Sequence, residues 1–315
     1  MRVFVTGATG VLGRPVLKQF VKSGASVLAL SRSDENRRLI SRLGATAVDA
    51  NLFDPVSLAP HLAECDAVLH LATSIPKTSD MKRSGAWSQN DRIREAGTAA
   101  LVEATKAAGT AKTFIYPSVS FMYGDGGDGW LTAETARIEP AGPLLSTLAA
   151  ERSVAGFAKS ADGRRGVSLR FGVFYGPASR ESQDTLRMAR RGMALPLSPA
   201  KAFKSHIWVE DAASAVIAAL QRAPNGVYDV VEDEPFTQEQ ATSALARAVG
   251  RRSLVKLPRV LLRLALPFEM RALLARSQRV SAARFKDVTG WKPQVPNQTD
   301  GWMRIAASVE FPATA

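Results

Sequence analysis

The sequence predicts an α/β protein whose core is a doubly wound parallel sheet, with a smaller, mostly helical region at the C-terminal end. Two observations carry this prediction. Short, continuous apolar runs alternate with helical patterns through the first half of the chain, and the last quarter is mostly helical. Continuous apolar runs are typical of strands buried on both faces, as in a parallel sheet. Their regular alternation with helices over short links indicates a doubly wound sheet.

The elements are expected in a regular order. Strands rich in Val, Ile, Leu and Phe are expected at 2–6, 26–31, 46–49, 67–72 and 113–118. The helices between them are expected at 12–23, 34–43 and 90–108. Gly, Asp and Pro predict a loop over 124–143. After it we expect a helix at 144–160, a strand at 167–175, a basic helix at 182–194, a strand at 205–209, a helix capped by Asp211, and a strand at 227–231.

Length and composition exclude several classes of protein. The chain has 315 residues, of which 46% are hydrophobic and 22% charged, as in an ordinary globular protein. A single cysteine, Cys65, excludes an intrachain disulfide and a multi-cysteine metal site, and no metal is expected. No apolar run reaches the ~18 residues of a membrane-spanning helix. Met1 and Arg2 lead directly into a strand and not into a signal peptide, so a cytoplasmic location is expected.

The charge of the chain is strongly basic. Lys and Arg number 41 against 29 Asp and Glu, which gives a formal net charge of +12. Such a balance favours polyanions, among them nucleic acids, acidic membrane surfaces and phosphorylated small ligands. The alternative is a solvated basic surface with no ligand. The arginines are scattered and accompany no nucleic-acid-binding motif, so no nucleic-acid partner is expected.

The turn after the first strand has the pattern of a phosphate-binding loop. Gly7 permits a tight turn, Gly10 lets the backbone approach a pyrophosphate, and Gly13 allows close packing of helix on strand. The N-terminus of the following helix then offers free N–H groups to the phosphates. This turn predicts a Rossmann-type dinucleotide-binding domain, with cofactor contacts from Gly7, Thr9, Gly10, Val11, Leu12 and Gly13.

The residues after the second strand indicate which dinucleotide binds. Proteins that bind NAD normally have a carboxylate at this strand end for the ribose 2′-hydroxyl. Here the chain has Ser31 and Arg32, with Arg37 and Arg38 nearby. Because a guanidinium can form a charge-assisted fork with a 2′-phosphate, the sequence favours NADP(H) over NAD(H). In the alternative interpretation Arg32 is a solvated surface residue.

Further motifs follow in a fixed order: Asn51-Leu52-Phe53-Asp54, His70-Leu71-Ala72-Thr73, Gly97-Thr98, Tyr123-Gly124-Asp125, Arg170 to Pro177, Val209-Glu210-Asp211 and Gly290-Trp291-Lys292-Pro293. Together with the glycine loop they resemble the extended short-chain dehydrogenase/reductase family, in its NAD(P)-dependent epimerase/dehydratase-like branch. The resemblance implies adenine contacts from Asn51 and Leu52, and cofactor contacts from Leu71, Ala72 and Thr73. It also implies pairing of two copies through two helices of the sheet domain.

The motifs also suggest how the chain divides. Residues 1–168 are expected to form the NADP-binding Rossmann domain, to which residues 203–231 return. Residues 169–315 are expected to form the C-terminal substrate-binding region.

The catalytic residues of that family do not match. The family uses a Ser or Thr and a Tyr-x-x-x-Lys pair, in which Tyr exchanges a proton with the substrate oxygen and Lys lowers the pKa of Tyr. The segment that should hold the pair, 143–151, contains neither Tyr nor Lys. The position four residues before Tyr123 is Val119, where the hydroxyl would stand. The resemblance therefore implies an atypical member of the family.

Three other residues are candidates for the chemistry. Ser118 and Ser120 end the strand that the resemblance directs at the nicotinamide, so either could hydrogen-bond the substrate, and Ser118 is also expected to contact the cofactor. Plain turn residues are the alternative for both. His206 lies on an expected strand, and a histidine suits acid–base work near neutral pH. A structural role is the alternative for His206, and His70 is expected in the core.

The substrate end is less clearly marked. Lys204 stands where sugar-nucleotide enzymes of the family often have an Arg for the substrate diphosphate, but their basic segment before Trp291 is not evident. The stretch from Leu257 to Arg279 is apolar with interspersed Arg. It could form a lid over a hydrophobic substrate, a dimer contact or a membrane-surface helix. Because Pro258 and Pro267 interrupt it, two short helices on the substrate side are expected.

The leading hypothesis is an NADP(H)-dependent oxidoreductase or epimerase-like enzyme on a small, fairly apolar metabolite, with an atypical acid or base. The alternative is a non-redox isomerase or cyclase, or an NADP-sensing regulatory protein, that binds the dinucleotide without turning it over. An orthodox sugar-nucleotide epimerase ranks third because it would need the missing Tyr.

Overall fold

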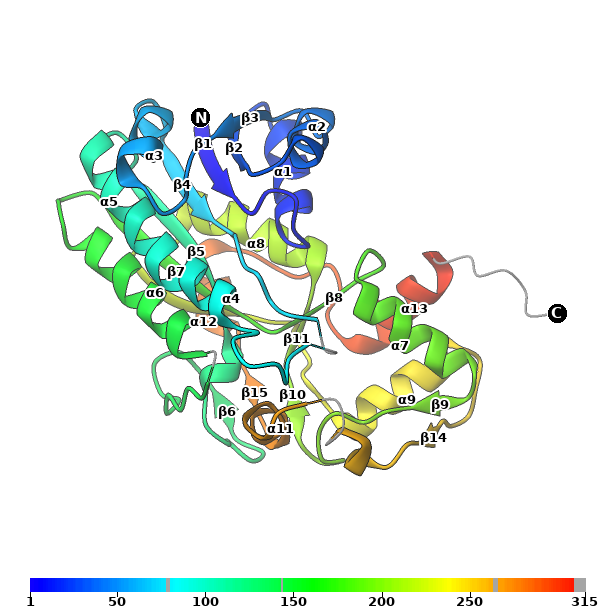
Figure 1. Cartoon of the computed structure of the whole chain (residues 1–315). Helices are drawn as coiled ribbons and strands as arrows, with labels where there is room; N and C mark the ends of the chain where they lie inside the picture. Colours follow the sequence, from blue (N-terminus) through cyan, green and yellow to red (C-terminus); the bar gives the residue numbers. More distant parts are fainter. Residues whose placement is uncertain (78–79, 143, 263–265, 309–315) are drawn as a thin grey trace.

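Seven parallel strands form the central sheet, in the order β12-β7-β5-β4-β1-β2-β3 (Figure 1). The structure is a computed structural model and describes residues 1–77, 80–142, 144–262 and 266–308. The chain moves outward from β1 to β3, returns to β4 and then moves outward in the opposite direction. This is the order of a Rossmann sheet, so the predicted fold class is confirmed. The strands are β1 (Arg2–Thr6), β2 (Ser26–Ser31), β3 (Thr46–Asp49), β4 (Ala67–His70), β5 (Thr113–Val119), β7 (Arg165–Phe171) and β12 (Gly226–Val230).

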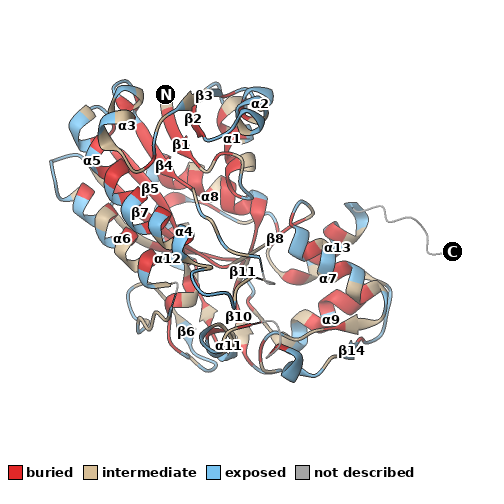
Figure 2. Cartoon of the chain, viewed as in Figure 1, coloured by how far each residue is buried: buried red, intermediate tan, exposed pale blue. Residues whose placement is uncertain are grey.

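Helices cover both faces of this sheet, and two apolar cores lie between the layers (Figure 2). On one face pack α1 (Gly13–Lys22), α8 (Val209–Arg222) and α12 (Ala283–Thr289), with α2 (Asp34–Arg42) beside β2 and β3. On the other face pack α3 (Pro55–Leu62), α5 (Thr98–Ala108) and α6 (Leu144–Ala158). Alternate residues of β1 serve the two cores, since Val3 and Val5 lie in one and Phe4 in the other. This is why the strands read as continuous apolar runs.

Most of the remaining elements form a region beside the carboxyl ends of the strands (Figure 1). Its own core contains Tyr175, Trp208, Leu245 and Trp302. Besides the seven sheet strands and the helices named above, the described elements are α4 (Ser88–Arg92), η1 (Ile93–Gly97), η2 (Ser120–Met122), β6 (Trp130–Leu131), β8 (Val173–Tyr175), α7 (Arg180–Arg190), β9 (Met193–Ala194), β10 (Phe203–Lys204), β11 (His206–Trp208), β13 (Phe236–Thr237), α9 (Gln238–Ala248), β14 (Val255–Lys256), η3 (Arg259–Leu261), α11 (Phe268–Ala275), β15 (Arg279–Val280) and α13 (Gln298–Ser308).

Three elements differ from their expected form. The helix expected at 90–108 is divided by a π-helical turn, η1, in which the side chain of Arg94 is buried. The strand expected at 167–175 is divided at Gly172, where the chain leaves β7 and pairs as β8 with β11. A Cβ at Gly172 would lie 2.6 Å from the carbonyl oxygen of Ser205, so the crossing requires glycine. Helix α8 begins at Val209, earlier than expected, and this places Asp211 inside its first turn.

Asp211 is therefore not the cap of α8, as the sequence had suggested. Its carboxylate is buried and accepts hydrogen bonds from the backbone N–H groups of Gln294 and Val295, both at 2.9 Å. Burial raises the pKa of Asp211. The residue fastens the C-terminal part of the chain to the start of α8.

The expected boundary between the Rossmann domain and the C-terminal region, after residue 168, falls within the strand β7. In the returning segment 203–231, α8 and β12 belong to the sheet layers, whereas β10 and β11 pair with β13 and β8 outside the central sheet. The division itself stays a prediction.

A buried ion pair joins α6 to the sheet. The carboxylate of Glu151 on α6 accepts two hydrogen bonds from the Arg170 guanidinium on β7, at 2.9 and 2.7 Å. Both side chains are only 6% exposed. The two-bond geometry offsets much of the cost of removing both charges from water.

Replacing Glu151 by Gln is expected to lower the free energy of unfolding by about 3–5 kcal/mol, because it leaves the Arg170 charge buried without its partner. The measurement is urea unfolding followed by circular dichroism. Glu103→Gln on the exposed face of α5 is the matched control and should change stability by less than about 0.5 kcal/mol. Equal effects of the two substitutions would contradict the role of the ion pair.

Candidate functional site

The glycine loop between β1 and α1 lies tightly against the end of β4. Gly7 has φ +73°, and a Cβ there would lie 2.5 Å from the backbone nitrogen of Ala72. A Cβ at Gly13 would lie 2.1 Å from the carbonyl oxygen of Gly7. The backbone N–H of Gly10 donates to that same oxygen at 3.0 Å. These contacts leave no room for side chains, so the loop presents backbone groups to a ligand.

The N-terminus of α1 is open to an anion. Among the described residues no side chain caps it, and no acidic residue occupies its first turn. Of the predicted contacts, Gly10 and Val11 are exposed and Thr9 is half-buried. Leu12 is buried in the core, so only its backbone could serve a ligand. An uncapped N-terminus beside a tight glycine turn fits a pyrophosphate.

The end of β2 presents an arginine. Arg32 is exposed and starts the turn into α2. Ser31 is buried, and its hydroxyl donates to the carbonyl oxygen of Ser33 at 3.0 Å, so this hydroxyl stabilises the turn. Arg37 lies 3.6 Å from Asp34 and 3.7 Å from Asp49, and these carboxylates neutralise part of its charge.

The other predicted cofactor residues line the neighbouring strand ends. The backbone N–H of Leu71 donates to Thr6 at 3.0 Å and extends the pairing of β4 with β1, which leads Ala72 and exposed Thr73 away from the sheet. Asn51 is exposed, and its side-chain oxygen accepts from the Phe53 N–H at 3.1 Å. Leu52 is buried against Gly97. These residues border one edge of the sheet, at the switch between β1 and β4, where dinucleotides bind in such folds.

Ser118 ends β5 with its hydroxyl already engaged. It is buried and donates to Glu151 at 2.5 Å. A hydroxyl carries a single proton, so Ser118 faces any further partner as an acceptor. This arrangement disfavours Ser118 as a proton donor to a substrate. The structure brings it together with Glu151 and Arg170, whose pairing could not be read from the sequence.

The same hydrogen-bond network continues from β7 to β12, the edge strand of the sheet. Arg170 donates to the Tyr123 hydroxyl at 3.1 Å, and Tyr123 donates to Asp229 at 2.6 Å. Burial raises the pKa of Asp229 to about 7, opposed by the hydrogen bond from Tyr123 and the charge of Arg170. Tyr123 is fully buried, and its hydroxyl links Arg170 on β7 to Asp229 on β12.

The segment expected to carry Tyr-x-x-x-Lys is helical and contains neither residue. Residue 143 lies outside the described residues, and 144–151 form the first half of α6. Thr147 is fully buried on that helix beside Tyr116. The Tyr116 hydroxyl accepts a hydrogen bond from the buried guanidinium of Arg94 at 2.6 Å. Arg94 was missed by sequence reasoning, because nothing local marks an arginine inside a helical pattern as buried.

The two histidines near the strand ends, His70 and His206, have hydrogen-bonded imidazole rings. His70 is buried, with Nδ1 2.6 Å from the Thr6 hydroxyl and Nε2 3.3 Å from the Ile93 carbonyl. Burial lowers the pKa of His70 to about 4. Burial also lowers the pKa of His206 to about 4, so at neutral pH its imidazole is uncharged. His206 Nδ1 lies 3.1 Å from the side-chain nitrogen of Gln298.

His206 lies in the wall of an apolar pocket of about 350 Å³ in the C-terminal region. Neither Ser118 nor Ser120 is among the described residues that line this pocket. Ser120 is buried in η2. The structure therefore does not assemble the three candidate catalytic residues around one cavity. The pocket wall also contains Lys204, Ser198 and residues of α7, α9, α11 and α13.

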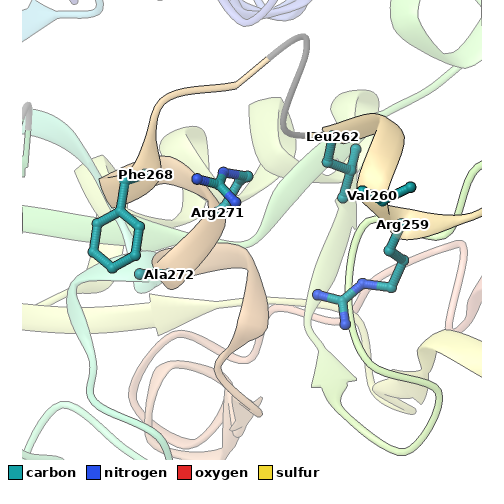
Figure 3. Close-up of a pocket in the computed structure, with 6 residues that line it drawn as sticks. All are labelled: Arg259, Val260, Leu262, Phe268, Arg271 and Ala272. Carbon is teal, nitrogen blue, oxygen red and sulfur yellow. The ribbon is translucent and has the colours of Figure 1, made fainter.

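The stretch from Leu257 to Arg279 forms two short helical pieces, η3 and α11, and residues 263–265 between them lie outside the described residues. A second pocket, of about 370 Å³, lies between these pieces (Figure 3). Its wall combines apolar side chains with the guanidinium groups of Arg259 and Arg271. Leu274 of α11 lines the apolar pocket that contains His206, so this helix borders both pockets.

The residues that the structure describes contain neither a helix that could span a membrane nor a cluster of metal ligands. None of their helices is both long and apolar enough to cross a bilayer. Their His, Cys, Asp and Glu side chains form no group of three or more that could hold a metal ion.

The fold and the glycine loop define a dinucleotide-binding protein of the short-chain dehydrogenase/reductase type. Residues 3–231 match the NAD dependent epimerase/dehydratase family. The chain belongs to this family, and the resemblance drawn from its motifs is confirmed. It is 32% identical over 310 residues to the 3-diazoavenalumate denitrifying reductase of a Streptomyces species, covering 96% of this chain and 99% of that protein.

Solved structures share the fold over nearly the whole chain. Human epimerase family protein SDR39U1, crystallised with NADPH, has a TM-score of 0.83 at 22% identity, covering 98% of this chain and 100% of that one. The UDP-glucose 4-epimerase of Thermotoga maritima, with UDP-glucose, has a TM-score of 0.78 at 20% identity, covering 98% of both chains.

Gly13→Ala is expected to weaken NADPH binding by about tenfold or more, because the new Cβ would displace the Gly7 carbonyl and distort the loop. Fluorescence titration with NADPH measures the change. Gly156→Ala is the matched control, since a Cβ on this helical glycine meets nothing within 4 Å. If Gly13→Ala left the affinity unchanged, the assignment of the loop to the dinucleotide would be wrong.

Proposed function

We propose that the protein is an NADP(H)-dependent reductase that delivers a hydride to a small, fairly apolar, electron-poor substrate without a proton donor from the family's usual pair. One observation carries the proposal: the dinucleotide loop is complete, whereas the neighbouring part of α6 holds neither Tyr nor Lys. Ser118, the nearest hydroxyl on β5, already donates to Glu151.

This combination suits a reaction in which no substrate oxygen must be protonated. Loss of a diazo group is such a reaction, since a hydride replaces N₂ on carbon and the nitrogen leaves as a neutral molecule. The name of the Streptomyces relative, a denitrifying reductase of a diazo compound, supports this chemistry for a chain that aligns with it from end to end. We therefore propose a diazo-substituted or similarly electrophilic aromatic compound as the substrate.

In this proposal the residues of the chain bind and orient the dinucleotide and the substrate. When bound, NADPH supplies the hydride. Gly7, Gly10 and the N–H groups of α1 hold the pyrophosphate, and Arg32 holds the 2′-phosphate. Ser118 offers its hydroxyl oxygen to the cofactor as a hydrogen-bond acceptor, and the Glu151–Arg170 pair fixes the orientation of this hydroxyl. The buried apolar wall of the C-terminal pocket excludes water from the substrate.

Cofactor selection gives the first test. The protein is expected to bind NADPH more tightly than NADH, and Arg32→Ala should weaken NADPH binding by about 10- to 100-fold because a charge-assisted pair is lost. NADH affinity should stay unchanged. Arg42→Ala, an exposed position in the last turn of α2, is the control. Equal affinities of the parent protein for the two dinucleotides would rule out the preference.

Turnover gives the second test. Diazotised aminocinnamate and NADPH, incubated with the protein, are expected to give cinnamate, N₂ and NADP⁺ in equal amounts. Deuterium placed on C4 of NADPH should appear on the ring carbon that lost nitrogen, as mass spectrometry would detect. Reactions without protein measure the uncatalysed rate, and Gly13→Ala should be slower than the parent protein when NADPH is below saturation.

Tight NADPH binding without turnover of diazo, carbonyl or alkene compounds would contradict the reductase and favour the regulatory alternative. Pairing of two copies through helices of the sheet domain and a cytoplasmic location both stay predictions. Light scattering of the purified protein tests the first of these.

A further inference from the structure

The residues that line the apolar pocket of the C-terminal region suit a flat, unsaturated ligand. It has a volume of about 350 Å³ and is surrounded by α7, α9, α11, α13 and the strands β8, β10 and β11. Most of its wall is apolar, and aromatic rings recur around it. The rings are those of Phe121, Phe174, Tyr175, Phe236 and Trp302. Aromatic side chains favour planar π-systems stacked on or set edgewise against them.

One cation is set into this wall. Lys204 is 7% exposed, and its ammonium group donates to the backbone carbonyls of Arg276 at 2.7 Å and Leu273 at 3.4 Å. Within the described part of the chain no carboxylate forms an ion pair with it. An ammonium has three donors, and these two carbonyls use two of them. A buried charge without a counter-ion is costly, and an anionic ligand would offset that cost.

A second polar atom in the wall also lacks a partner. Ser198 is 1% exposed, and its hydroxyl has no hydrogen-bond partner among the described residues. The loop that carries it is held in place, because the Gln238 side-chain oxygen accepts from the N–H groups of Leu197 and Ser198, both at 3.1 Å. Buried hydroxyls are normally satisfied, so a rigidly held exception in a pocket wall points to a ligand atom.

From these three features we infer that the pocket binds an aromatic or conjugated carboxylate, with the flat body between the aromatic side chains, the carboxylate on the Lys204 ammonium, and a polar atom of the ligand on the Ser198 hydroxyl. The inference rests on the proposed function in one respect, because it takes the occupant to be the substrate of the reductase.

Binding of simple probes tests the inference. Cinnamate and its neutral analogue cinnamamide have the same flat body and differ in charge. Calorimetric titration of the purified full chain, saturated with NADPH, should give an affinity for cinnamate on the order of 10- to 100-fold higher than for cinnamamide. Lys204→Met, which keeps the apolar stem, should abolish this preference. The exposed Lys201→Met is the matched control and should keep it.

Ser198→Ala gives an independent variant. It removes one hydrogen bond, so affinity for a ring-hydroxylated or carboxylate probe should fall by a few-fold to about tenfold while the preference for the anion remains. NADPH affinity, a property of the glycine loop, checks that each variant is folded. If Lys204→Met failed this check, the comparison of the two probes on the parent protein and on Ser198→Ala would still decide.

The preference should also depend on pH. Burial lowers the pKa of Lys204 to about 8, the charges of Arg276 and Arg259 lower it further, and Asp125 opposes them. Three other titratable side chains line the pocket with Lys204: His206, which is uncharged at neutral pH, Tyr175, and Glu181 on α7. Above about pH 8 the ammonium loses its proton, so cinnamate affinity should fall by about tenfold per pH unit, while cinnamamide affinity stays level.

Equal affinities of the parent protein for the two probes, or a preference that survives Lys204→Met, would overturn the inference. The outcome is separable from that of the proposed function, because binding requires no hydride transfer. A protein that binds cinnamate through Lys204 and never oxidises NADPH would keep the pocket assignment and refute the reductase.

Discussion

The buried pair of Glu151 and Arg170 is the interaction on which the site depends. It joins α6 to β7, accepts a hydrogen bond from the Ser118 hydroxyl through Glu151, and donates one to the Tyr123 hydroxyl through Arg170. The backbone oxygen of Tyr123 in turn accepts hydrogen bonds from Arg276 at 3.0 Å and Gln278 at 2.6 Å. The Arg276 carbonyl accepts from the Lys204 ammonium. One connected set of polar contacts thus runs from the carboxyl edge of the sheet to the wall of the apolar pocket.

The central sheet could be predicted because its information is local. Each strand is a short run of apolar residues that must be buried on both sides, and Gly7 and Gly13 mark the turn that begins the fold. The breaks in the pattern could not be predicted. Gly172 is needed because Ser205 approaches it, and Asp211 is buried because Gln294 and Val295 reach it from the far end of the chain. Such contacts join positions distant in sequence.

The candidate site also contains some residues that could be predicted from local sequence and others that depend on contacts between distant positions. The residues proposed for the dinucleotide lie together at one sheet edge, since they follow strands whose order is known once the fold is known. The polar groups that shape the rest were not foreseen. Glu151 stands on a helix of ordinary composition, and Arg94 occupies a π-helical turn, a local distortion that is frequent at functional sites. Sequence could reveal that Tyr and Lys were missing, but not what had taken their space.

The packing around Tyr116 bears on how this chain could change by mutation. Thr147 is fully buried beside the tyrosine ring that the Arg94 guanidinium also contacts. A lysine introduced at Thr147 would therefore bring a second positive charge next to Arg94 in a region closed to water. Two cations held side by side without a counter-ion are costly to bury, so a lysine at this position is expected to require a second change at Arg94.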